Sequence, residues 1–223
     1  MNTKKIKKKR RTQTNIRTLI SQNLKILEYE ITYEAVKDQR IEKLPVKVKE
    51  RLEYLYDMIF HNPKKAIIEL ERLIERYPYI PQFYNYLANA YLNIGEFEKS
   101  ESIVLESYDK FPDYLFSKLN YAQYCIDKEE YNEIPKIFNN KFDLKLLYPR
   151  RKKFHISEVV QFAGVIGYYH AKIGDNQAAE LFYNMLRKLA PKHNLTKILK
   201  RELYPSAFYS MLRKLEQIVK SST

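Results

Sequence analysis

Four side-chain carboxamides recur at steps of three and four residues in one segment of the chain, at Gln82, Asn85, Asn89 and Asn93. Residues at that spacing share one face of a helix. A carboxamide offers both hydrogen-bond donors and acceptors, so such a face suits an extended peptide, whose backbone carries unpaired groups of both kinds. Plain solvation of an exposed helix is the alternative, although asparagine is a mediocre helix former and its recurrence at four-residue steps is uncommon.

Basic side chains form two further clusters. Each cluster could neutralise phosphates and bind nucleic acid in a sequence-independent, salt-sensitive way. Tyr148 and Phe154 flank the second cluster, where they could stack on exposed bases or belong to the core. The first cluster could equally contact an acidic protein or an anionic membrane surface, serve as a nuclear localisation signal, or only aid solubility. The two clusters consist of Lys4, Lys5, Lys7, Lys8, Lys9, Arg10 and Arg11, and of Arg150, Arg151, Lys152 and Lys153.

The net charge of +13 is concentrated at the N-terminus. Residues 1–27 contain nine basic side chains and no acidic one, so the remaining chain holds 31 basic against 27 acidic residues. Mutual repulsion is expected to keep residues 1–13 as an extended, disordered arm. We therefore expect RNA or another polyanion to be attracted to this arm rather than to the chain as a whole.

Signatures of catalysis, cofactors and metals are missing from the sequence. The four histidines, His61, His155, His170 and His193, show no metal-ligand spacing. A single cysteine, Cys125, excludes a disulfide framework. We expect no enzymatic activity, no cofactor and no metal site. His170 and Cys125 are expected to lie in the core, and Gly167 to allow close packing of helices.

No segment has the composition of a membrane span or a secretory signal. The longest uncharged stretch, residues 77–95, is interrupted by prolines and asparagines. No continuous apolar block follows the basic arm. We expect a cytoplasmic protein, with the nucleus as the alternative in a eukaryotic cell.

Residues 81–113 have the pattern of two helices joined by a turn. Apolar residues recur at helical steps on both sides of Gly95, and Pro112 stands where the second helix must end. The closing proline has a counterpart 34 residues earlier, at Pro78, and the whole layout returns in residues 162–191. Regular spacing of this kind indicates one helical hairpin used repeatedly.

This layout resembles the tetratricopeptide repeat, whose signature is an aromatic residue, a Leu-Gly pair, a tyrosine, an alanine, a second aromatic residue and a closing proline. The resemblance implies an all-α, right-handed superhelical solenoid of about four stacked antiparallel hairpins, with flanking helices. It also implies a concave groove lined by the first helix of each hairpin, faced by Phe116, Gln123 and Tyr168 as well as the carboxamides. The positions that carry it are Tyr84, Leu87, Ala88, Tyr91, Ser100, Val104 and Pro112 in the clearest unit, and Ile166, Gly167, His170, Ala179, Tyr183 and Pro191 in the last.

The expected organisation is a repeat domain between flanking segments. Its parts are a basic arm (1–13), an N-terminal helix and linker (14–46, helical over 14–38), the repeat domain (47–193) and C-terminal capping helices (194–203 and 205–219, within 194–223). Within the repeat domain the units span 47–80, 81–114, 115–139 and 160–193, with an irregular insertion at 140–159. Pro135 falls inside the second helix of the third unit. The groove-facing side chains of the first unit cannot be assigned.

The sequence therefore predicts a non-enzymatic protein-interaction scaffold that binds a peptide or protein partner. The groove residues expected to bind it are Gln82, Asn85, Asn89, Asn93, Phe116, Gln123 and Tyr168. Basic residues matching a clamp for a partner's C-terminal carboxylate are not evident. The alternative is an RNA- or ribosome-associated protein that binds nucleic acid through the arm and through Arg150–Lys153.

Overall fold

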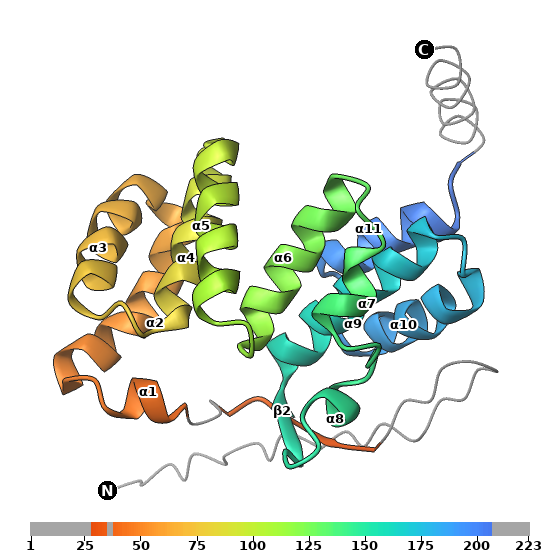
Figure 1. The fold of residues 1–223 in the computed structure, drawn as a ribbon, viewed down its shortest axis with the longest axis horizontal. Coiled ribbons are helices and arrows are strands. Elements are labelled where there is room, and N and C mark those ends of the chain that lie inside the picture. The colour runs from red at the N-terminus through yellow and green to blue at the C-terminus, as the bar shows by residue number, and fades with distance from the viewer. Residues whose placement is uncertain (1–27, 35–37, 207–223) are drawn as a thin grey trace, which may run out of the picture.

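Paired helices make up most of the chain in the computed structural model, which describes residues 28–34 and 38–206 (Figure 1). Helices α2 to α5 form one end of the molecule and α9 to α11 the other, with α6 between them (Figure 1). The all-α class is thus confirmed for the described residues, apart from two short strands. The elements are β1 (Glu30–Thr32), α1 (Gln39–Glu42), α2 (Val46–His61), α3 (Pro63–Arg76), α4 (Pro81–Asn93), α5 (Phe97–Lys110), α6 (Leu115–Asp127), α7 (Glu133–Ile137), α8 (Leu144–Leu147), β2 (Lys153–His155), α9 (Ile156–Lys172), α10 (Asn176–Leu189) and α11 (Asn194–Leu203).

The residues between paired helices fit the backbone that they occupy. Gly95 separates α4 from α5, and Gly174 separates α9 from α10; each has a φ of +79°, which favours glycine. Helices α3 and α4 begin with Pro63 and Pro81, in the first turn, where the missing amide hydrogen breaks no helical bond. The turn predicted at Gly95 is therefore confirmed.

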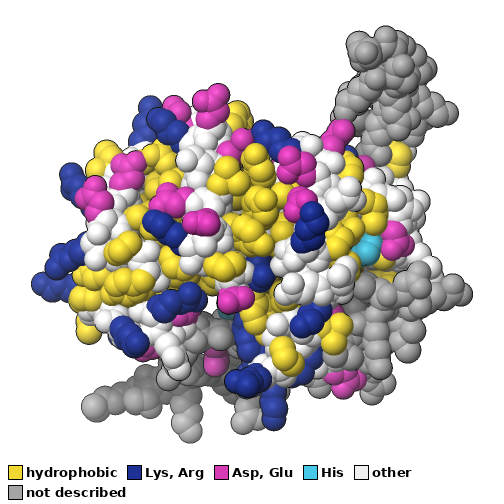
Figure 2. Space-filling model, viewed as in Figure 1, with side chains coloured by type: hydrophobic (Ala, Val, Ile, Leu, Met, Phe, Trp, Pro, Cys, Tyr) yellow, Lys and Arg dark blue, Asp and Glu magenta, His cyan; other side chains and the backbone are white. Residues whose placement is uncertain are grey.

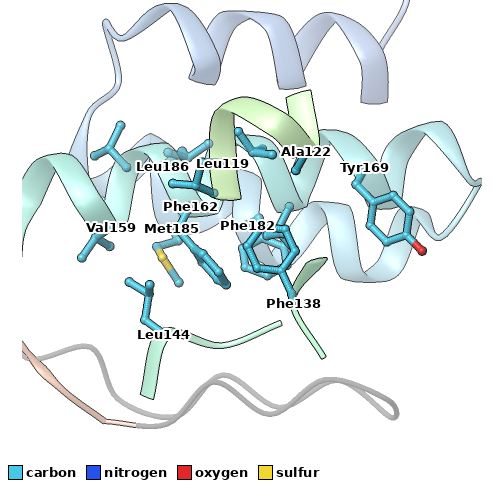
Figure 3. Close-up of a cluster of buried hydrophobic side chains, with 14 of the residues drawn as sticks. Leu119, Ala122, Phe138, Leu144, Val159, Phe162, Tyr169, Phe182, Met185 and Leu186 are labelled. Atoms are coloured by element: carbon cyan, nitrogen blue, oxygen red, sulfur yellow. The ribbon is translucent and has the colours of Figure 1, made fainter. Parts of the chain in front are cut away.

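Two separate clusters of buried side chains hold the helices together. One lies among α2, α3 and α4 and contains the fully buried side chains of Leu55, Leu70 and Phe83. The other packs α6, α7, α9 and α10 around residues such as Phe138 and Phe182 (Figure 3). Each cluster buries the apolar faces of neighbouring helices against one another.

Positions related by the 34-residue spacing are buried alike. Ala66 and Leu70 on α3 correspond to Ser100 and Val104 on α5, and all four side chains are buried. The hydroxyl of Ser100 donates to the carbonyl of Ala88 at 2.9 Å, so the polar member of the set is satisfied inside the helix pair.

Polar and aromatic side chains join the two clusters between α5 and α6. Ser107 and Ser117 share a buried hydrogen bond of 2.7 Å. Tyr108 stacks on Tyr121, with ring centroids 4.3 Å apart. This α5–α6 seam therefore connects two separate apolar cores through hydroxyl groups and stacked rings.

The helix predicted over residues 14–38 is wrong for residues 28–34. Glu30–Thr32 forms a strand that pairs in parallel with β2, and Ile31 lies opposite Phe154. Tyr29 and Ile31 are buried while Glu30 is only partly buried, so burial alternates with the two-residue period of a strand. Strand pairing places Ile31 in the buried cluster that contains Phe138 and Phe182. Residues 14–27 and the basic arm lie outside the described residues.

The second helix of the third unit is shorter than expected. Pro135 lies in the first turn of α7, and Asn139 and Asn140 follow the helix with positive φ values of 51° and 55°. The ammonium group of Lys118 donates to the carbonyl of Ile137 at 3.0 Å and satisfies one of the free carbonyls at this helix end.

The insertion predicted at 140–159 is more ordered and ends earlier than expected. It contains α8 and β2, and α9 already begins at Ile156. The start of α9 is fixed by a capping box, in which the Glu158 carboxylate accepts from the amide of His155 at 2.8 Å. The helix predicted over 194–203 is confirmed as α11, whereas 207–219 lies outside the described residues.

Candidate functional site

A groove of about 1440 Å³ is lined by side chains of α2, α4, α6, α9 and α11. The first four of these helices follow one another along the molecule (Figure 1). They are the first helices of the four expected hairpins. Segments near residues 38–40, 113–114 and 148–158 complete the lining.

The structure brings six of the seven predicted groove residues together. These are Gln82, Asn85, Asn89, Phe116, Gln123 and Tyr168. Asn93 is the exception, because its amide donates to the carbonyl of Ile59 at 2.8 Å. That carbonyl belongs to the last turn of α2, where it has no partner within the helix. Asn93 therefore joins α4 to α2 and does not line the groove.

Hydrogen bonds link the carboxamides of α4 and α6 along the groove. The amide of Asn120 donates to the side-chain oxygen of Asn85 at 2.9 Å, which bridges the two helices. Asn89 donates to the backbone carbonyl of Asn85 at 2.7 Å, and Gln82 donates to the hydroxyl of Tyr86 at 2.6 Å. Asn120 was missed in the sequence, although it lies 35 residues after Asn85, close to one repeat length.

Helix α2 contributes a groove face that could not be assigned from the sequence. Glu53, Tyr56, Asp57 and Phe60 line the groove from α2 at steps of one, three and four residues. Tyr56 and Phe60 are 50% and 56% exposed, and their rings meet edge to face at 5.6 Å. The sequence could have identified this face, because it is the side of α2 opposite the buried apolar residues, which include Leu55.

Charged side chains along the groove are mostly acidic. The lining contains six carboxylates and two arginines, Arg40 and Arg151. Each arginine is already paired, Arg40 with Asp38 and Arg151 with Glu158, both at 2.7 Å. The carboxylates are those of Asp38, Glu53, Asp57, Asp113, Asp127 and Glu158.

One of these carboxylates is less acidic than usual. Partial desolvation by neighbouring groups raises the pKa of the exposed Asp127 carboxyl, while a hydrogen bond of 2.8 Å from the Gln123 amide acts in the opposite direction. Asp127 lies at the end of α6, so this amide also fixes the carboxylate against the groove.

The second basic cluster is only partly free. Lysine and arginine side chains gather at the lower edge of the view in Figure 2, where Figure 1 places β2. Arg151 is bound to Glu158, and Lys153 pairs with Glu30 at 3.1 Å, whereas Arg150 and Lys152 are exposed and form no ion pair with another described residue.

The aromatic residues that flank this cluster have packing roles. Phe154 is fully buried, and Tyr148 donates its hydroxyl to the carbonyl of Asp113 at 3.0 Å. The base-stacking interpretation is therefore wrong for Phe154, because its ring faces the core. Lys4, Lys5, Lys7, Lys8, Lys9, Arg10 and Arg11 lie outside the described residues.

His170 and Cys125 both lie in the core, as expected. Burial lowers the pKa of His170, although Asp175, 3.1 Å from its Nδ1, acts against this change. Burial also raises the pKa of the Cys125 thiol, which disfavours the nucleophilic thiolate. Within residues 28–34 and 38–206, no group of three or more histidine, cysteine, aspartate or glutamate side chains is arranged to hold a metal ion.

Comparison of the chain with protein-family models, curated proteins and solved structures found no match. In the described part of the chain, every helix is too short or too polar to pass through a lipid bilayer. The chemistry of the groove is therefore the basis for assigning a function.

Proposed function

We propose that the groove binds an extended segment of a partner protein, and that the chain is a non-enzymatic interaction module. The observation that carries this proposal is the carboxamide bridge from Asn85 to Asn120, which spans two helices along an open groove. We also propose that the hairpins form a solenoid of tetratricopeptide type. The 34-residue spacing and the side-by-side order of α2, α4, α6 and α9 support that arrangement.

The carboxamide bridge holds polar atoms ready for a peptide backbone. No other described residue bonds the side-chain amide of Asn85 or the side-chain oxygens of Asn89 and Asn120. A peptide laid along the groove would meet donors and acceptors whose side chains are already oriented, which reduces the entropy lost on binding. Exposed rings such as Tyr56 and Phe60 would bury apolar surface of the same ligand.

Selection from a random peptide library tests the proposal. The full chain is used to select twelve-residue peptides, whose affinities are then measured by fluorescence anisotropy. We expect the double variant Asn85→Ala, Asn89→Ala to weaken binding at least about tenfold. Asn93→Ala is the matched control, because it removes a carboxamide of the same helix that does not line the groove.

Circular dichroism verifies that each variant is folded. Peptides that bind the double variant as tightly as the unchanged chain would refute the proposal, and so would a selection that enriches no peptide. Equal loss in Asn93→Ala would show that the effect comes from the helix rather than from the groove.

Nucleic-acid binding stays the alternative, and it rests on the seven basic residues between Lys4 and Arg11. Arg150 and Lys152 are the members of the second cluster that could add to it. Arg150 and Lys152 do not line the groove, and deletion of residues 1–11 leaves Asn85 and Asn89 unchanged, so the two functions can be tested independently.

A further inference from the structure

The groove has the opposite charge to the chain as a whole. Its six carboxylates and two guanidinium groups leave four negative charges, whereas residues 28–223 together hold 31 basic against 27 acidic side chains. Composition therefore does not account for the acidic groove.

Four of the groove carboxylates are available to a ligand. Glu53, Asp57, Asp113 and Asp127 are all exposed, and none forms an ion pair with another described residue. The two arginines that could neutralise them are engaged by Asp38 and Glu158. Charges of one sign in a concave site focus the field and attract ligands of the opposite sign.

Aromatic rings lie beside these carboxylates. On α2 the order along the exposed face is Glu53, Tyr56, Asp57 and Phe60, so acidic groups alternate with half-exposed rings. Tyr56 also lies 5.8 Å from Tyr86 on α4, ring to ring, and extends the aromatic surface across two helices. A lysine or arginine side chain matches both groups, because its stem packs on the ring while its cation faces the ring or a carboxylate.

We infer that the segment which occupies the groove is rich in lysine and arginine. This inference rests on the proposed function and names the chemical class of the peptide. The carboxylates would repel an acidic peptide or the phosphates of a nucleic acid. The carboxamide bridge would hold the backbone of the segment, and the acidic and aromatic face of α2 would select its side chains.

Fluorescence anisotropy with two labelled peptides tests the inference on the full chain. The cationic probe has the sequence TKKIKKKRRTQT, and the neutral probe carries glutamine at each of its seven basic positions. We expect the cationic probe to bind at least about tenfold more tightly, with affinity that falls as salt is raised. The double variant Glu53→Gln, Asp57→Asn should remove about tenfold of that affinity.

Glu98→Gln, Asp109→Asn is the matched control. It removes the same charge from exposed positions of α5 that do not line the groove, and should change the affinity less than about twofold. Equal losses in the two double variants would show diffuse surface attraction and overturn the inference. Labelled single-stranded RNA that loses affinity for the full chain in the Glu53→Gln, Asp57→Asn variant would overturn it as well.

Two outcomes separate this inference from the proposed function. If both probes bind equally and both depend on Asn85 and Asn89, the groove binds peptides without preference for charge, and only the inference fails. If neither probe nor any selected peptide depends on Asn85 and Asn89, the proposed function fails too. The probe has the same sequence as residues 3–14, so the chain's own arm could compete with it for the groove. Binding of the probe that is seen only after deletion of residues 1–11 would show that the arm occupies the groove. That result would overturn the inference that a partner protein supplies the segment.

Discussion

Replacing Gly167 by alanine should destabilise the protein, although alanine is the better helix former. Gly167 lies in α9, where an added Cβ would be 2.6 Å from Leu199 Cδ2 and 2.8 Å from Phe182 Cβ. The Leu199 methyl group can rotate away, but the Phe182 Cβ is bonded to the backbone of α10 and moves only with that helix. Overpacking costs about 1–3 kcal/mol, and the better helix propensity of alanine recovers about 1 kcal/mol, so we expect a net loss of up to about 2 kcal/mol.

Urea denaturation followed by circular dichroism measures this loss. Combining Gly167→Ala with Leu199→Ala provides the control, since removal of the leucine side chain relieves one contact and leaves the other. The alanine at Gly167 should therefore cost less in the Leu199→Ala background, but should still be unfavourable. A Gly167→Ala protein more stable than the unchanged chain would refute the close packing of α9 against α10.

Three further predictions concern the core and the basic arm. Phe154→Ala should lower the free energy of unfolding by about 3–5 kcal/mol in urea titrations, because its ring is fully buried; unchanged stability would contradict its place in the core. His170→Phe should lessen the loss of stability in acid. Burial lowers the pKa of His170, so as the pH falls below 6.5 the unfolded chain takes up a proton that the native protein does not, and stability falls. Urea titrations at about pH 7.5 and 5.5 measure this, and equal acid losses in both proteins would refute it. Deletion of residues 1–11 should abolish any salt-dependent gel shift with single-stranded RNA; a surviving shift would exclude the arm as the contact.

The helix pairs were predictable because their signals are local and periodic. The burial of Leu70 and Val104 follows from helical steps within one segment and from the spacing between segments. The strand at Glu30–Thr32 was not predictable in this way, because its partner β2 lies far along the chain. Only pairing decides whether a short alternating segment becomes a strand, and pairing is not a local property.

The groove was predicted in part for a similar reason. Asn85 and Asn89 share a face with Asn93, but Asn93 stands at the end of α4, where a free carbonyl of α2 is its nearest partner. The arginine Arg151 was grouped with its basic neighbours, yet a carboxylate seven residues later binds it. Spacing identifies the face of a helix, whereas the end of a helix and the neighbouring chain decide what each side chain contacts.

If the groove holds a segment as proposed, the α5–α6 seam would determine how the molecule responds to it. The groove crosses from α4 to α6, so it extends over both cores, while the seam itself holds them by a serine pair and stacked tyrosines. A bound segment that forms hydrogen bonds with Asn85 and Asn120 would add contacts between α4 and α6, on either side of this seam. Filling the groove would then stiffen the protein along its length, and changes at one end would be transmitted to the other.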